Sequence, residues 1–214
     1  TELSPLGNPK DPYTRSKRDC EQYVRNLQAQ GHPIQITYPS GIFGPDDPRL
    51  NESNHAMVTM LRDVIPITST GIQCVDVRDL AALHVFLLEN PPKGMMTEAR
   101  FILAGHYYPW AEFHQMLQHI TGKSIFHLPL PGPLLRVCGH IMDWVKKVIP
   151  IDFPMTSESM EIVTRWVIAD SSKALQHANL SFRSGEETFT DTIAWLVKAG
   201  HLAQKKAGKI SPPA

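Results

Sequence analysis

The chain has 214 residues, of which 42% are hydrophobic and 20% are charged, as in an ordinary globular protein with one large domain or two small ones. Lysine plus arginine number 21 and aspartate plus glutamate number 21, so there is no basic excess that would suggest nucleic acid as a partner. The three cysteines lie far apart in the sequence and predict neither a disulfide framework nor a zinc site, which favours a reducing compartment and hence the cytoplasm.

Helical and extended patterns alternate along the chain. Asp11 and Pro12 stand where a helix would start, apolar residues then recur at helical spacing, and Gly31 would end that helix. Strands are expected at 33–38, 72–77 and 101–104, and further helices at 79–89, 110–120, 131–148, after Ser171 or Ser172, and at 190–199. This order of helices and short strands predicts an α/β sheet.

The segment from Pro12 to Lys17 carries the clearest chemical pattern. Tyr13 and Lys17 are four residues apart in the first expected helix, so their side chains share one face about one turn apart. A neighbouring ammonium lowers the pKa of a phenol, which can then donate a proton to a carbonyl oxygen or take one from an alcohol. Taken alone, the spacing also fits a surface aromatic beside a solvated lysine.

Further segments strengthen this interpretation. In chain order, the informative segments are Pro12-Tyr13-x-x-Ser16-Lys17 with Glu21, Ile36 to Pro45, Val75 to Ala81, Ala169 to Ala174, and Thr192 to Leu196. Together they resemble the extended short-chain dehydrogenases/reductases, the NAD-dependent epimerase/dehydratase family, over nearly the whole chain. Within that family the sequence is most similar to the branch of dihydroflavonol reductases and 3β-hydroxysteroid dehydrogenases, and sugar epimerases and dehydratases are the nearest rivals.

The resemblance implies an α/β fold that is the C-terminal part of a Rossmann-type parallel sheet with a small, mostly helical substrate lobe. Residues 1–100 would be the remainder of the dinucleotide-binding domain with the catalytic helix. Residues 101–214 would mainly form the substrate-binding lobe and the C-terminal helices.

The resemblance also implies an oxidoreductase that uses NAD or NADP. Tyr13 would be the acid/base, Lys17 would be its partner and a ligand of the cofactor ribose, and both would contact the cofactor. The nicotinamide end would meet a strand-to-loop segment that could equally be an ordinary turn, made of Pro39, Ser40, Gly41 and Ile42.

Asn51 and Asn54 follow that segment and could face the substrate, although a plain loop role fits them equally. Many apolar side chains occupy 101–149, which favours a small, apolar carbonyl or alcohol substrate. A nucleotide-sugar epimerase or dehydratase would instead need cations placed for a diphosphate, and that alternative stays open.

Two features of the family pattern are missing from the sequence. No glycine-rich dinucleotide turn occurs in the sequence, and only Ser4, in a Ser-Pro turn, is a serine before Tyr13, so the family's catalytic Ser or Thr is not assigned. We therefore expect on the order of a hundred further residues, several βα units, to precede this chain in a complete enzyme. A non-catalytic remnant that binds a ligand or partner is the alternative.

The remaining features carry weaker expectations. Ten histidines show no metal-ligand spacing, so no metal is expected. No stretch has the roughly 18 uncharged apolar residues of a spanning helix. The amphipathic segment 131–149 could lie on a membrane with its basic residues toward the headgroups, although packing on the substrate lobe is the commoner case. A small-molecule substrate and a homo-oligomer are both compatible with the sequence.

Overall fold

The computed structural model describes residues 1–9, 12–91, 94, 98–149, 156–165 and 167–211. Helices and strands alternate over most of the chain, as expected. In order, the elements are α1 (Pro12–Ala29), β1 (Ile36–Pro39), β2 (Gly41–Phe43), α2 (Glu52–Arg62), β3 (Ile65–Ile67), β4 (Gly71–Asp76), α3 (Val77–Glu89), β5 (Arg100–Leu103), β6 (His106–Pro109), α4 (Trp110–Thr121), β7 (His127–Pro129), α5 (Gly132–Val148), α6 (Ser157–Thr164), α7 (Ser172–Ala178), α8 (Gly185–Lys198) and α9 (Gln204–Ala207).

Strand pairing among these residues is mostly parallel. β1 pairs with β5, β2 pairs with β4, and β3 pairs with β7, all in parallel, whereas β4 pairs with β6 in the antiparallel sense. Parallel pairs need long crossover connections, and here helices such as α3 supply them. The expected α/β class with parallel strands is confirmed.

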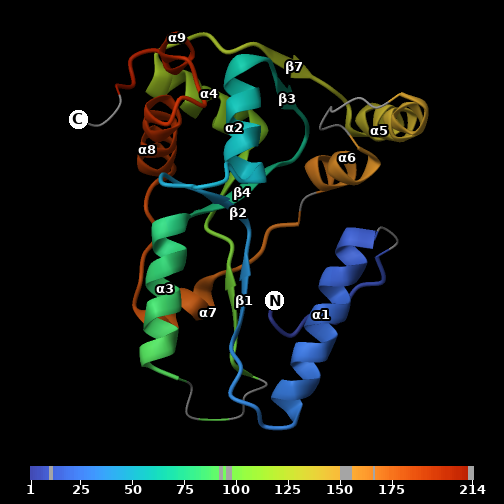
Figure 1. Ribbon diagram of the computed structural model, residues 1–214, viewed down its shortest axis with the longest axis vertical. Coiled ribbons are helices and arrows are strands. Elements are labelled where there is room, and N and C mark those ends of the chain that lie inside the picture. Colours follow the sequence, from blue (N-terminus) through green and yellow to red (C-terminus); the bar gives the residue numbers. More distant parts are fainter. Residues whose placement is uncertain (10–11, 92–93, 95–97, 150–155, 166, 212–214) are drawn as a thin grey trace.

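Two apolar clusters hold the elements together. The smaller one joins Leu80, Leu83 and Leu87 of α3 to Phe101 and Leu103 of β5, with two alanines of α7. The larger one is centred on side chains of α2, α4 and α8, including the fully buried Met57, Phe113 and Phe189. Figure 1 shows the smaller cluster's elements in the lower half of the molecule and the larger cluster's elements above them.

The expected elements are confirmed with shifted ends. β1 begins three residues after the expected strand, and α8 begins at Gly185 instead of 190, because Ser184 caps it by accepting a hydrogen bond from the Glu187 N–H at 3.1 Å. Elements of only a few residues, such as β2, β3, β7 and α9, were not predicted, since so short a segment cannot display a period.

The division at residue 100 stays a prediction. β5 begins at Arg100 and pairs with β1, while β6 pairs with β4, so strands from both sides of that division share sheets. The larger apolar cluster likewise contains side chains from both segments, such as Met57 and Phe189.

Candidate active site

α1 carries the predicted Tyr13 and Lys17 pair. The helix begins at Pro12, as predicted, and Gly31, with φ of 87°, follows its end. Tyr13, Lys17, Glu21 and Arg25 recur at intervals of four residues and therefore form one stripe along α1. The side chain of Tyr13 lies outside the described residues, and Lys17 is exposed.

The later members of this stripe meet β1. The Tyr38 hydroxyl donates to Glu21 Oε1 at 2.7 Å, and the Arg25 guanidinium lies 2.5 Å from the same carboxylate oxygen. Arg25 also donates to the Ser4 carbonyl at 3.2 Å, while its Nε is buried and has no partner among the described residues. Burial, followed by the hydrogen bond to the Glu21 carboxylate, raises the pKa of Tyr38.

A cavity of about 430 Å³ opens beside this cluster. Glu21 and Arg25 of α1 form one wall, and Tyr38, Pro39 and Ser40 lie along the end of β1. The remaining wall comes from Thr1, Glu2, Ser4 to Gly7, Gln73, Ile102, Ala104, Val167 and Ala169. The volume falls within the range of small-molecule sites, and the lining mixes charged, hydroxyl and apolar groups.

Of the four residues predicted to meet the nicotinamide, Pro39 and Ser40 line this cavity, whereas Gly41 and Ile42 do not. The Ser40 hydroxyl donates to the Ala104 carbonyl at 2.6 Å, and its N–H donates to the Leu103 carbonyl at 3.2 Å, so β5 fixes its position. Gly41 pairs in parallel with β4, and Ile42 packs on the smaller apolar cluster. Lys17 is not among the lining residues.

Asn51 and Asn54 organise the loop that follows β2. The Asn51 side chain caps α2 by accepting from the Asn54 N–H at 2.9 Å. Asn54 is 1% exposed, and its amide donates to the Gly44 carbonyl at 3.1 Å and to Asp47 Oδ2 at 3.0 Å. Its Oδ1 has no partner among the described residues. Both side chains thus have structural contacts, and their role toward a substrate stays a prediction.

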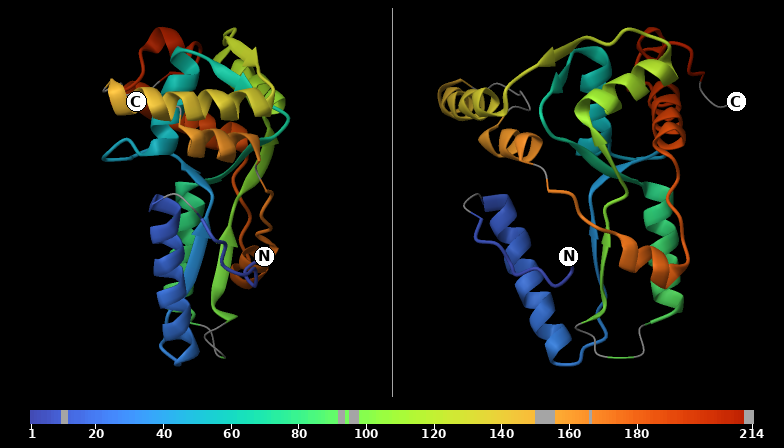
Figure 2. Two further views of the ribbon diagram at one scale, coloured as in Figure 1. Left: turned by 90° about the vertical axis from the view of Figure 1, so that its right-hand side faces the viewer. Right: turned by 180° about the vertical axis from the view of Figure 1, so that it is seen from behind.

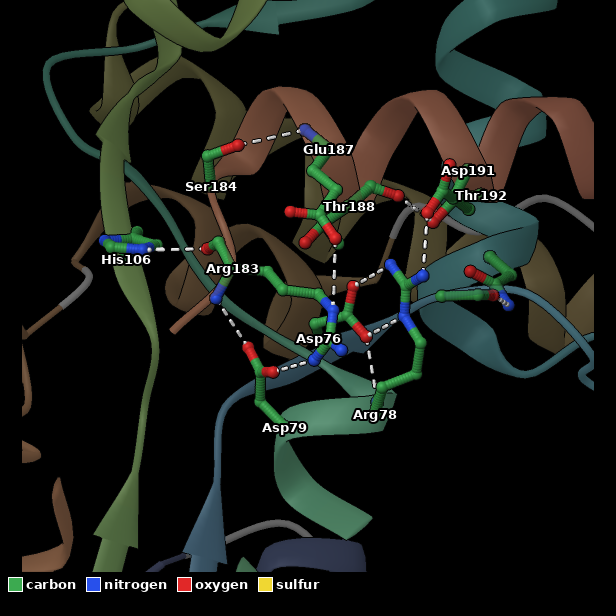
Figure 3. A network of polar contacts seen from close by, with 12 residues as sticks. Asp76, Arg78, Asp79, His106, Arg183, Ser184, Glu187, Thr188, Asp191 and Thr192 are labelled. Atoms are coloured by element: carbon green, nitrogen blue, oxygen red, sulfur yellow. Dashed lines mark hydrogen bonds and ion pairs between the residues drawn. The ribbon is translucent and has the colours of Figure 1, made fainter. Parts of the chain in front are cut away.

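A second polar cluster lies where β4 runs into α3 (Figure 3). The Asp76 carboxylate caps α3 and accepts from Arg78 Nε and Nη2 at 2.9 and 2.7 Å, and Arg78 also binds Asp191 of α8 at 2.7 Å. Asp79 pairs with the Arg183 guanidinium and accepts from the Arg183 N–H. Although burial works against it, hydrogen bonding from Arg78 holds the pKa of Asp76 below its ordinary value. The network fastens α8 to the end of β4.

Two other groups with altered pKa values lie near these strands. Burial raises the pKa of the Cys74 thiol to about 12, and burial raises that of the Tyr108 phenol to about 12. Together with Tyr38, these groups stay protonated at neutral pH and are poorly suited to ionise during a reaction. The part of the chain that the structure describes holds no group of three or more His, Cys, Asp or Glu side chains placed to bind a metal.

The sequence did not predict the cluster of Glu21, Arg25 and Tyr38 or the network around Asp76. A signal existed for each: Glu21 and Arg25 continue the four-residue spacing of Tyr13 and Lys17, and Asp76 stands at a strand end directly before a helix, a capping position. The partners Tyr38, Asp191 and Arg183 carried no such signal, because they are distant in sequence.

The apolar side chains of 101–149 that suggested an apolar substrate have another use. Phe101, Trp110, Phe113, Leu117 and Leu135 are at most 6% exposed and form the molecule's own core. Of the residues in 101–149, only Ile102 and Ala104 line the cavity. The many apolar side chains of 101–149 are therefore no evidence that the cavity wall is apolar.

Residues 1–99 match the model of the NAD dependent epimerase/dehydratase family. Over 207 residues the chain is 26% identical to a Synechocystis sp. protein whose name reads "Putative dihydroflavonol 4-reductase". That alignment covers 93% of this chain and 58% of the relative, so the chain spans well under two thirds of the relative's length.

Solved structures with the same fold include both reductases and epimerases. Vestitone reductase from alfalfa (Medicago sativa) superposes with a TM-score of 0.57 at 20% identity, covering 89% of this chain and 53% of that one. UDP-glucuronic acid 4-epimerase from Bacillus cereus, in complex with UDP-glucuronic acid and NAD, superposes with a TM-score of 0.62 at 19% identity, covering 91% and 55%. The expected resemblance and Rossmann-type fold are thus confirmed.

Proposed function

We propose, from the match of residues 1–99 to the NAD dependent epimerase/dehydratase family, that this chain is part of an NAD- or NADP-dependent oxidoreductase. The enzyme transfers a hydride between the cofactor and a small, apolar carbonyl or alcohol. The observation that carries the proposal is the stripe on α1: Tyr13 and Lys17 lie on the same helical row as Glu21 and Arg25, which line the cavity.

In this proposal Tyr13 moves the proton. Its phenol donates to the carbonyl oxygen during reduction and accepts from the alcohol during oxidation. Lys17, one turn later in α1, favours the phenolate through its positive charge and so lowers the pKa of Tyr13. Lys17 also donates hydrogen bonds to the cofactor ribose. The cofactor, when bound, supplies or accepts the hydride.

The residues present fit one end of a dinucleotide. The cavity of about 430 Å³ is lined by Ser40 and Arg25 and by the apolar residues Pro39 and Ile102. Pro39, Ser40, Gly41 and Ile42 are assigned to the nicotinamide end, Gly41 and Ile42 through the backbone next to the cavity. No glycine-rich turn is present in these residues to cradle the pyrophosphate, so this chain alone holds the cofactor weakly.

Asn51 and Asn54 are assigned to the substrate side. Asn51 is exposed at the start of α2, and the buried Oδ1 of Asn54 has no partner among the described residues, so it could accept a hydrogen bond. The preference for a small apolar substrate rests on the similarity to the Synechocystis protein, since the apolar residues of 101–149 lie mainly in the core.

The test compares Tyr13→Phe and Lys17→Ala in the longest protein that the gene encodes. Tyr13→Phe should lower kcat by roughly 10²–10⁴-fold and leave cofactor affinity nearly unchanged, because only the proton donor is lost. Lys17→Ala should lower both kcat and cofactor affinity. Tyr23→Phe is the matched control, since Tyr23 is 66% exposed on the same helix and should behave as the wild type. Equal, mild losses from Tyr13→Phe and Lys17→Ala would overturn the assigned roles.

A nucleotide-sugar epimerase or dehydratase of the same family is the second candidate. The similarity to UDP-glucuronic acid 4-epimerase favours it, as does Arg25, a cation already in the cavity wall. A panel of apolar ketones, alcohols and nucleotide sugars separates the two, and faster turnover of a nucleotide sugar would replace the first proposal. If neither class turns over and neither NADH nor NADPH binds, the chain is a non-catalytic binding module.

We assign the protein to the cytoplasm, where Cys20, Cys74 and Cys138, which form no disulfide, would stay reduced. Its partner is a small molecule, and a homo-oligomer, as many soluble enzymes form, is compatible with the sequence. Light scattering of the purified protein tests the oligomer, and fractionation of cells tests the compartment.

A further inference from the structure

α5 exposes an apolar stripe along one face. Leu134, Val137, Ile141, Trp144 and Val148 alternate at intervals of three and four residues, so they lie on one side of the helix. Their exposed fractions run from 50% to 67%. Single exposed apolar side chains are ordinary, but a continuous row of five on one helix marks an interaction surface.

The opposite face of α5 packs against α6. A Cβ added to Gly139 would come within 2.8 Å of the Ser157 Cα, so the two helices touch at their backbones. Arg136 donates to the Thr164 hydroxyl at 2.8 Å, and Asp143 accepts from Ser157. The apolar stripe therefore points away from α6. Figure 2, in its left view, shows α5 lying across the side of the molecule with no element in front of it.

Positive charge borders the stripe. At 100° per residue, Lys147 and His140 lie along one edge of the apolar face, whereas Lys146 lies on the α6 side of the helix with Leu135 and Gly139. Asp143 is the only acid in α5, and its carboxylate is engaged by Ser157 on the α6 side. The exposed side of α5 is thus apolar at its centre and basic along one margin.

This arrangement fits an anionic bilayer surface better than a second copy of the chain. The stripe covers about two heptads, fewer than the three to four that a stable coiled coil requires. An anionic bilayer complements both features at once, because its acyl region accepts the apolar side chains and its headgroups attract Lys147. Trp144, 67% exposed, has the amphipathic ring typical of membrane interfaces.

We propose that α5 docks the protein onto anionic phospholipid membranes by lying flat in the interface, with the stripe from Leu134 to Val148 in the outer acyl region and Lys147 at the phosphates. The helix has 17 residues and carries charges, and among the described residues no helix is long and apolar enough to cross a bilayer. Attachment is therefore peripheral and reversible.

Sedimentation of the purified protein with vesicles tests this docking. The protein should bind vesicles of phosphatidylcholine mixed with phosphatidylglycerol several-fold better than vesicles of phosphatidylcholine alone, and Trp144 fluorescence should shift to the blue on binding. The double variant Leu134→Ser/Ile141→Ser should lose binding. Lys147→Ala should bind about fivefold more weakly, the effect of one cation near an anionic surface.

Two double variants elsewhere serve as controls. Val85→Ser/Leu88→Ser removes exposed apolar groups from α3, and Lys198→Ala/Lys205→Ala removes two exposed cations on α8 and α9. Both should bind vesicles as the wild type does, and circular dichroism confirms that every variant is folded.

Three results would overturn the proposal. The first is no binding to either vesicle. The second is binding that survives Leu134→Ser/Ile141→Ser. The third is a dimer in light scattering that this double variant dissociates, which would assign the stripe to contact between two copies.

Discussion

α1 and α3 lie beside the same pair of strands, β1 and β5, but they are attached in different ways (Figure 1). α3 buries Leu80, Leu83 and Leu87 against β5 and α7. The only buried side chain among the described residues of α1 is Gln28, which is 2% exposed. One helix is held by apolar area and the other by a few directional polar contacts.

The polar attachment of α1 is concentrated at its C-terminal half. Gln28 Nε2 donates to the carbonyls of Ile34 and Ala99 at 2.8 and 3.3 Å, and its Oε1 accepts from Arg100 Nε at 2.9 Å. Toward its N-terminus α1 diverges from β1, and the cavity opens beside it. The helix with the proposed catalytic pair is thus positioned by hydrogen bonds, whereas α3, on the opposite side of the strands, contributes more to the stability of the fold through its buried leucines.

The largest effect is expected in α3. Leu83 is 1% exposed, so Leu83→Ala should lower the free energy of unfolding by about 2–5 kcal/mol, through lost burial and the cavity left behind. Urea denaturation measures this. Val85→Ala on the same helix, at a site 54% exposed, should change stability by less than about 0.5 kcal/mol. A small effect at Leu83 would mean that α3 is not held by its apolar face.

The second-largest loss of stability is expected when the polar network at the start of α3 is broken. Asp76→Ala removes the helix cap and leaves Arg78 without its main partner, and should cost about 2 kcal/mol, since Arg78 is partly exposed and can turn to water. Asp191→Ala, which removes only the exposed partner of Arg78, is the milder control. Equal losses from both variants would contradict the central place of Asp76.

Acid should weaken this network in a predictable direction. Because the folded pKa of Asp76 is lowered from 3.8, its contribution is fully present above about pH 4 and is lost as the pH falls through the lowered value. The stability difference between the wild type and Asp76→Ala should therefore shrink below about pH 4. Urea denaturation at a series of pH values measures it, and a difference that stays constant would contradict the lowered pKa.

In α1 the expected effect is smaller and local. Gln28→Ala leaves the carbonyls of Ile34 and Ala99 and the Arg100 guanidinium with fewer partners, and should cost about 1–2 kcal/mol. Hydrogen exchange should accelerate in α1 far more than in α3. Acceleration spread evenly over both helices would show that α1 and α3 unfold as one unit.

The smallest effect is expected on the outer side of α1. Tyr23 is 66% exposed, so Tyr23→Ala should change the free energy of unfolding by no more than about 0.5 kcal/mol. Thermal unfolding followed by circular dichroism measures it. A loss comparable to that of Gln28→Ala would reveal that this side of α1 is covered by a partner.

The same contrast explains which structural predictions succeeded. The helices at 79–89, 110–120 and 131–148 were found because their apolar side chains recur at the helical period. The role of α5 was left open, because a periodic apolar stripe looks the same whether it is buried or exposed. The contacts of Gly139, Arg136 and Asp143 with α6 show which face of α5 turns inward.

At the candidate site, local spacing was predictable from the sequence: Tyr13 and Lys17 one turn apart in a helix, and a strand that leads into Pro39 to Ile42. Local geometry depends on neighbours in the chain, so a pattern of residues suffices to predict it. Tertiary structure alone decided that Glu21 and Arg25 meet Tyr38, that Ser40 but not Ile42 faces the cavity, and that Asp76 fastens α8 through Arg78. Those contacts join residues far apart in sequence, and they form only where packing of the apolar clusters brings the strands and helices together.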